Sequence, residues 1–157
     1  MTKPIAVIRI RGAAGTPGEI EDTLKMLKLT RPNHMRIFSK PNQSILGMIK
    51  KIEEYVTWGE IDQQTIEHVL RARGRTIGNK KLTEEHVKEI GFNGISELAQ
   101  KIFSGEIDIN EIKTIKPIFR LTPPSGGFKN STKRHYSSDG ELGDRGSEIN
   151  KLIKRMC

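Results

Sequence analysis

The sequence predicts an α+β fold with a β-α-β-α-β core, a helical extension, and a basic extended arm that ends in a helix. Three observations predict it. Strand and helix patterns alternate through residues 1–61, whereas residues 62–122 carry mostly helical periodicities. Residues 123–157 begin with a stretch rich in Gly, Ser and Lys and close on one amphipathic segment. We therefore divide the chain at residues 61 and 122.

The core is predicted to contain three strands. In residues 5–11 the side chains alternate between two faces, one holding Ala6, Ile8 and Ile10 and the other Val7, Arg9 and Arg11. A second strand is predicted over residues 35–40, with Ile37 pointing inward. The β-forming residues 55–58 predict a third strand just before Gly59.

Two amphipathic helices connect these strands. Apolar side chains recur at helical spacing as Ile20, Leu24 and Leu27 in residues 17–28, and then as Ile45, Met48, Ile49 and Ile52. Asn42 or Ser44 is the expected cap of the second helix. Because the five elements alternate, we expect a small three-stranded sheet with both helices on one face and the other face free.

The extension is predicted to contain three helices and a short strand over residues 118–121. The first helix follows Asp62 as its cap, the second runs from Thr83 to near Gly91, and the third ends at Gly105. A basic loop over residues 74–82 separates the first two.

The arm from Pro123 to Gly146 is almost free of apolar residues. We therefore expect it to have no core of its own and to be mobile in the free protein. A last amphipathic helix follows, with its apolar stripe at Ile149, Leu152, Ile153 and Met156.

The charge balance points to an anionic partner. The 157 residues include 27 Lys and Arg against 19 Asp and Glu, a formal charge of +8, with a pI of about 9.7. The excess lies at the two ends of the chain, because residues 62–116 are balanced. No apolar run approaches the roughly 18 residues of a transmembrane helix. A secretory leader is not apparent either, and the single Cys157 excludes an internal disulfide framework. We expect a cytoplasmic protein without membrane contact.

Catalytic chemistry is not indicated. Gly12, Gly15 and Gly18 follow a strand and open a helix, but their spacing differs from the dinucleotide-binding fingerprint. The four histidines are scattered and stand apart from the one cysteine, so the pattern indicates neither a metal site nor an activated nucleophile. The sequence therefore predicts a non-enzymatic protein without metal or cofactor.

The basic residues are the candidate RNA-binding site. They lie on the outer face of the first strand, at the end of the first extension helix and in its loop, in the arm, and on the last helix. The set comprises Arg9, Arg11, Arg71, Arg73, Arg75, Lys80, Lys81, Lys129, Lys133, Arg134, His135, Lys151, Lys154 and Arg155.

Other interpretations of these residues stay open. Arg9 and Arg11 are equally well explained as solvated side chains, and one arginine near a helix end compensates the helix dipole. The arm is explained by a disordered tail, or by a basic segment with Phe128 and Tyr136 that orders along RNA. The total charge favours the second explanation of the arm.

Several segments resemble the large-subunit ribosomal protein L-thirty family in its archaeal type, whose eukaryotic counterpart carries the number seven. In the core these are Ser44-Ile45-Leu46-Gly47-Met48-Ile49 and Val56-Thr57-Trp58-Gly59-Glu60. The end of the chain is more specific: Leu121 to Gly127 (LTPPSGG), then Lys129, Lys133 and His135, Gly143 to Arg145, and Ile149 to Met156. The resemblance spans nearly the whole chain.

The resemblance implies a ferredoxin-like core, a structural role in the large ribosomal subunit, and binding to large-subunit ribosomal RNA. It also implies a position near the 5S ribosomal RNA and contacts with neighbouring ribosomal proteins. Two positions depart from the family pattern: Leu46 and Ser125 stand where relatives often carry arginine. Two other functions stay open, a free-standing RNA-binding module or RNA chaperone, and an enzyme acting on an acidic substrate.

Overall fold

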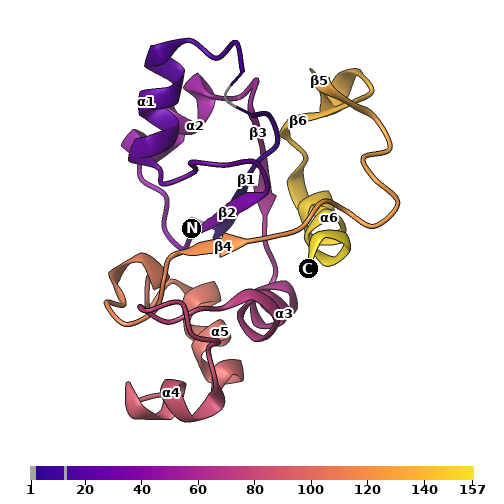
Figure 1. Ribbon diagram of the computed structural model, residues 1–157. Coiled ribbons are helices and arrows are strands. Elements are labelled where there is room, and N and C mark those ends of the chain that lie inside the picture. Colours follow the sequence, from indigo (N-terminus) through magenta and orange to yellow (C-terminus); the bar gives the residue numbers. More distant parts are fainter. Residues whose placement is uncertain (1–2, 13) are drawn as a thin grey trace.

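A computed structural model describes residues 3–12 and 14–157 (Figure 1). Its central sheet has the strand order β4-β2-β1-β3-β6-β5. The strands are β1 (Ile5–Arg9), β2 (His34–Phe38), β3 (Val56–Glu60), β4 (Ile118–Arg120), β5 (Ser131–His135) and β6 (Gly140–Asp144). The α-helices are α1 (Gly18–Met26), α2 (Gln43–Lys51), α3 (Gln63–Arg73), α4 (Glu84–Glu89), α5 (Ile95–Ser104) and α6 (Ile149–Met156).

The first three strands and two helices form the ferredoxin-like core. β1 lies between β2 and β3 and is antiparallel to both, so β2 and β3 run parallel with a strand between them, which is the split β-α-β arrangement. Asn42 caps α2 by accepting a hydrogen bond from the backbone N–H of Ile45 at 2.8 Å. The predicted α+β class, with its helical extension and terminal helix, is confirmed.

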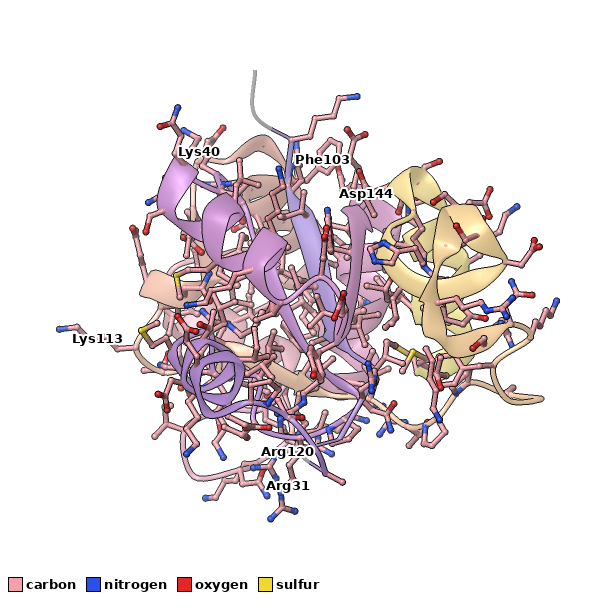
Figure 2. All side chains as sticks on the ribbon, turned by 90° about the horizontal axis from the view of Figure 1, so that it is seen from above. Arg31, Lys40, Phe103, Lys113, Arg120 and Asp144 are labelled. Atoms are coloured by element: carbon pink, nitrogen blue, oxygen red, sulfur yellow. The ribbon has the colours of Figure 1, made fainter. Side chains whose placement is uncertain are left out.

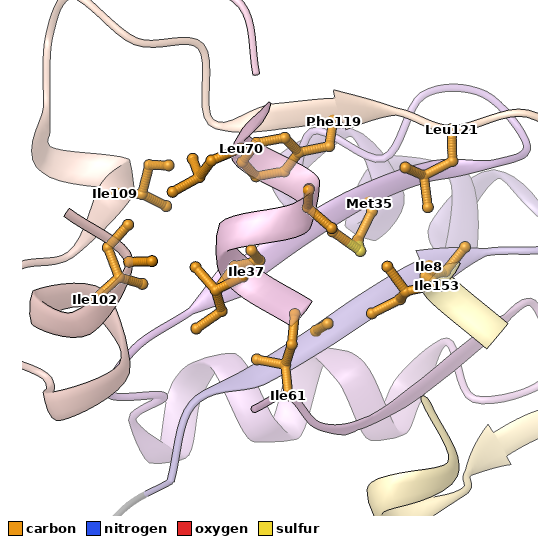
Figure 3. Packing of buried hydrophobic residues seen from close by; sticks show 14 of the residues in the cluster. Ile8, Met35, Ile37, Ile61, Leu70, Ile102, Ile109, Phe119, Leu121 and Ile153 are labelled. Carbon is orange, nitrogen blue, oxygen red and sulfur yellow. The ribbon is translucent and has the colours of Figure 1, made fainter. Parts of the chain in front are cut away.

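Both faces of the sheet are buried, which corrects the expectation of one free face. Ile5 and Val7 of β1 pack against α1 and α2. Ala6 and Ile8 point the opposite way, into a second and larger cluster formed with α3, α5 and α6 (Figure 3). The apolar alternation of the first strand is as predicted, but α1 and α2 cover the face that carries Val7 and Arg9, which was expected to face outward. The helices on the opposite face come from distant parts of the chain.

The extension and β4 complete this larger cluster. α3 and α4 begin at the predicted caps: Asp62 accepts from the backbone N–H of Thr65 at 2.7 Å, and Thr83 from that of His86 at 3.2 Å. The stretch between α5 and β4 forms a short 3-10 turn, η1 (Ile109–Glu111). Ile109 and Phe119 are fully buried in the cluster, beside Ile102 and Leu70 (Figure 3).

The arm, which was expected to be an extended segment without a core of its own, lies against the sheet and forms two strands. β6 pairs in parallel with β3, placing Thr57 opposite Gly143 and Trp58 opposite Asp144. β5 pairs with β6 and forms the outer edge, on the side of the molecule where α6 also lies (Figure 1). Leu142 is buried in the larger cluster. The Gly-rich composition of the segment therefore coexists with strand pairing to the core.

Gly59 permits a close approach between the core and the C-terminal part of the chain. A Cβ atom at this position would overlap the backbone oxygen of Gly146 and press against Ile149. Any side chain at position 59 would therefore push α6 and the turn before it away from β3.

We expect Gly59→Ala to lower the free energy of unfolding by about 1–3 kcal/mol, because the added methyl group has no space. Gly47→Ala is the matched control. Gly47 lies in α2 with no atom near the position of a new Cβ, so this change should stabilise the protein by about 0.5–1 kcal/mol. Urea unfolding of both variants measures the difference, and unaltered stability of Gly59→Ala would contradict the close approach.

Candidate nucleic-acid interface

Arg9 does not belong to an RNA-binding surface, which corrects its assignment from the sequence. Its side chain is fully buried. Each guanidinium nitrogen donates to the protein at 2.8 Å: Nε to the carbonyl of Arg11, Nη1 to the carbonyl of Leu29, and Nη2 to Glu21 Oε1. Arg9 lies on the same face of β1 as Ile5 and Val7, and α1 covers that face, so no path is left for a phosphate and all three nitrogens have partners.

Arg36 is a second buried arginine on the same face of the sheet. It donates to the carbonyl of Leu27, at the end of α1, and to the side-chain oxygen of Asn110 in η1. Burial lowers the pKa of Arg36 from its ordinary value, while the charge of Asp108 opposes that shift. Arg9 and Arg36 together bind the carbonyls that follow α1, where the helix dipole favours positive charge.

Arg145 is the third, and it holds the arm to the core. Its Nε donates to Thr57 Oγ1 at 2.8 Å and its Nη2 to Glu141 Oε2 at 2.7 Å, with the two charged side chains about 95% buried. Thr57 in turn donates to the carbonyl of Gly143 at 2.9 Å. The guanidinium also lies over the ring of Tyr136, 4.9 Å from its centroid.

The basic run at the end of α3 and in the loop that follows contains side chains that are bound by the protein and side chains that are exposed without an ion pair among the described residues. Arg71 donates to Glu67 at 3.1 Å and to Glu84 at 2.7 Å, so it ties α3 to the start of α4. The hydrogen bond from Ser96, and then that from Arg71, lowers the pKa of Glu67. The hydrogen bond from the backbone N–H of Ile95 is the first cause that lowers the pKa of Glu84.

The rest of this run becomes more exposed along the chain. Arg73 and Arg75 are half-buried, with Arg73 donating to Thr122 at 3.4 Å. Arg75 forms a β-bridge with Lys81, which folds the predicted basic loop back on itself. Lys80 and Lys81 are exposed, and within residues 3–12 and 14–157 neither takes part in an ion pair.

The arm and α6 bring several predicted residues together. Lys129, Lys151 and Arg155 line one hollow of about 270 Å³. Arg155 is partly used by the protein, because it donates to the carbonyls of Ser125 and Gly127. Lys151 forms an exposed ion pair with Glu148 at 3.3 Å.

The remaining predicted residues of the arm and α6 differ in exposure. Lys133, Arg134 and Lys154 are exposed, whereas His135 is half-buried against Gly143. Arg11, from the first strand, is half-buried too, with its guanidinium 4.8 Å from the centroid of the Tyr55 ring. The exposed lysines of the arm are therefore among the accessible cations of the predicted set.

One cationic cluster was missed by the sequence reasoning. Thr30, Arg31, His34 and Arg120 surround a hollow of about 420 Å³ at one end of the sheet. Arg31 and Arg120 project beside each other in Figure 2. The pairing of β2 with β4 sets His34 opposite Arg120, a contact between residues 86 positions apart that no local pattern predicts.

The part of the chain that the structure describes contains no group of three or more His, Cys, Asp or Glu side chains arranged to hold a metal ion. Within the same residues, no helix is both long and apolar enough to cross a membrane.

Comparison with known proteins identifies the family. A family model described as ribosomal protein L30p/L7e matches residues 5–56, which run from β1 to the first residue of β3 in the ferredoxin-like core. Large ribosomal subunit protein uL30 of Staphylothermus marinus is 47% identical over 156 residues, covering 96% of each chain. This chain belongs to the uL30 family. The uL30 protein of Hyperthermus butylicus is 48% identical, over 98% of this chain and 90% of its own. That of Methanococcus maripaludis strain C5 is 47% identical, over 96% and 97%.

Membership of the uL30 family confirms the resemblance found in the sequence. The relatives match the extension and arm as well as the core, which the family model alone does not cover. At the two departures from the family pattern, Leu46 is an exposed side chain on α2, and Ser125 offers its carbonyl to Arg155.

The buried pair of Glu141 and Arg145 should contribute far more to stability than the exposed pair of Glu148 and Lys151. We expect Glu141→Ala to lower the free energy of unfolding by about 3–5 kcal/mol, because it leaves a buried guanidinium without its counter-charge. The control Glu148→Ala should cost less than about 1 kcal/mol. Urea unfolding measures both, and equal losses would mean that Arg145 does not anchor the arm.

Proposed function

We propose that this chain is a structural constituent of the large ribosomal subunit and binds large-subunit ribosomal RNA by phosphate neutralisation and shape. The observation that carries the proposal is the match over nearly the whole chain to relatives named large ribosomal subunit protein uL30. The cellular location would be cytoplasmic, in the large ribosomal subunit, and the protein would act in translation.

The exposed cations support RNA contact at two surfaces. One consists of Lys80 and Lys81 in the loop after α3, and the other of Lys129, Lys133 and Arg134 in the arm. Lys154 extends the second surface along α6. Flexible lysine side chains neutralise phosphates without reading base edges, so this binding depends on the shape of the RNA and on salt.

Half-buried members of the predicted set have a different part in the proposal. Arg11, Arg73, Arg75, His135 and Arg155 would help to shape the RNA-facing surface, since each also contacts the protein. Arg71 and Lys151 are engaged by carboxylates and would contact RNA only at the rim. Arg9 is excluded by its burial.

The charge distribution also supports protein partners. Residues 62–116 of the extension are neutral overall, and the exposed Phe103 on α5 lines a hollow together with Ile61 and Asn150. A neutral surface is better suited to a neighbouring ribosomal protein than to phosphates. Proximity to the 5S ribosomal RNA is part of the proposal through the family resemblance alone.

In a sucrose gradient of cell lysate, the protein should migrate with the large subunit at near one copy and remain there through moderate salt. The variant Lys129→Gln/Lys133→Gln should dissociate at lower salt, because it has lost two phosphate contacts. Each contact contributes roughly 0.7–0.9 to the slope of log affinity against log salt. Lys88→Gln/Lys113→Gln removes the same charge from exposed positions of the extension and should behave like the wild type.

Migration of the wild-type protein at the top of the gradient would contradict the proposal. It would favour the free-standing RNA-binding module, which binds RNA transiently. Equal salt sensitivity of the two double variants would leave the ribosomal assignment intact but would remove the arm lysines from the RNA contacts.

A further inference from the structure

The hollow formed by Thr30, Arg31, His34 and Arg120 has the properties of an anion site. It lies where the turn before β2 meets β4, at the end of the sheet. Arg31 and Arg120 are exposed, and neither has an acidic partner among the described residues. Two guanidinium groups thus face one cavity without a counter-charge.

The turn that carries Arg31 is held in place by the backbone. The N–H of Asn33 donates to the carbonyl of Arg9 at 2.7 Å, and the N–H of Leu121 donates to the carbonyl of Asn33 at 3.1 Å. Asn33 has a positive φ of 70°, which the tight turn requires. Since strands on both sides fix the turn, the position of the cavity wall is set before any ligand binds.

His34 supplies a neutral donor to this cavity. Its Nδ1 is buried and has no hydrogen-bond partner among the described residues. A buried N–H without an acceptor is costly, so the tautomer with the proton on Nε2 is favoured and leaves Nε2–H as a donor. Burial, and then the charges of Arg120, Arg31 and Arg9, lowers the pKa of His34, so the ring is neutral at pH 7.

We propose that this hollow binds one phosphate group of the ribosomal RNA backbone, with Arg31 and Arg120 on its oxygens and His34 as a neutral donor. Planar guanidinium groups bind phosphate oxygens through two parallel hydrogen bonds, and the hydroxyl of Thr30 lines the same cavity. The inference rests on the proposed function and adds a built site to the lysine surfaces. The charge of Arg9, which is buried and paired with Glu21, also adds to the positive potential at His34.

The deciding experiment compares two charge-matched variants of the full chain for affinity to deproteinised large-subunit ribosomal RNA. Arg31→Gln/Arg120→Gln should weaken binding about 10–100-fold at moderate salt. Lys88→Gln/Lys113→Gln should weaken it less than about 3-fold. All four positions are exposed, and circular dichroism checks that both variants stay folded. Equal weakening in the two variants would overturn the inference.

A second measurement identifies the source of the phosphate. Histidine-ring NMR of the wild-type protein follows His34 while inorganic phosphate is added, with the exposed His68 as the internal control. A shift confined to His34, together with the loss of RNA affinity above, supports the site. A shift without that loss would mean that the hollow takes free phosphate, and would overturn the RNA assignment.

The two proposals fail in different ways. If the wild-type protein does not bind ribosomal RNA at all, the proposed function falls and this inference falls with it. If the wild type binds ribosomal RNA but the Arg31→Gln/Arg120→Gln variant binds it as well as its control variant does, the phosphate site alone is wrong and the proposed function stands.

Discussion

Every residue of β1 is buried, and this constraint governs how the protein uses its arginines. A guanidinium on such a strand must find all its partners inside the protein, because an unpaired buried charge would cost several kcal/mol. Arg9 meets this condition with two carbonyls and Glu21. Two other buried arginines are paired inside the protein in the same way. Arg36 joins η1 to the end of α1, and Arg145 joins the arm to β3.

The positive charge of the chain is therefore divided between two tasks. Buried arginines join segments far apart in the sequence, which suits a planar group with several fixed donors. Exposed lysines stand on the loop after α3 and on the arm, where mobile side chains can follow a phosphate backbone. The cavity at Arg31 and Arg120 combines both features, since its arginines are exposed but the turn that carries Arg31 is fixed by backbone hydrogen bonds to Arg9 and Leu121.

Local patterns predicted much of the fold, because caps and apolar periodicities are set by neighbouring residues. The helices of the core, the caps at Asp62 and Thr83, and the two faces of the first strand were read in this way. The covered second face could not be read, because it depends on α6, at the far end of the chain. Alternation predicts which side chains share a face of the strand, but it does not reveal that Arg9 lies on the face that α1 covers. The pairing of His34 with Arg120 was hidden for the same reason.

The central claim is that exposed lysines contact RNA while Arg9, Arg36 and Arg145 serve the fold. Ultraviolet crosslinking of intact large subunits, followed by peptide mass spectrometry, tests it most directly. The account predicts RNA crosslinks on peptides that contain Lys80 and Lys81 or Lys129 to Arg134, and none on residues 5–9 of β1. Crosslinks confined to β1, with the arm unmodified, would contradict it.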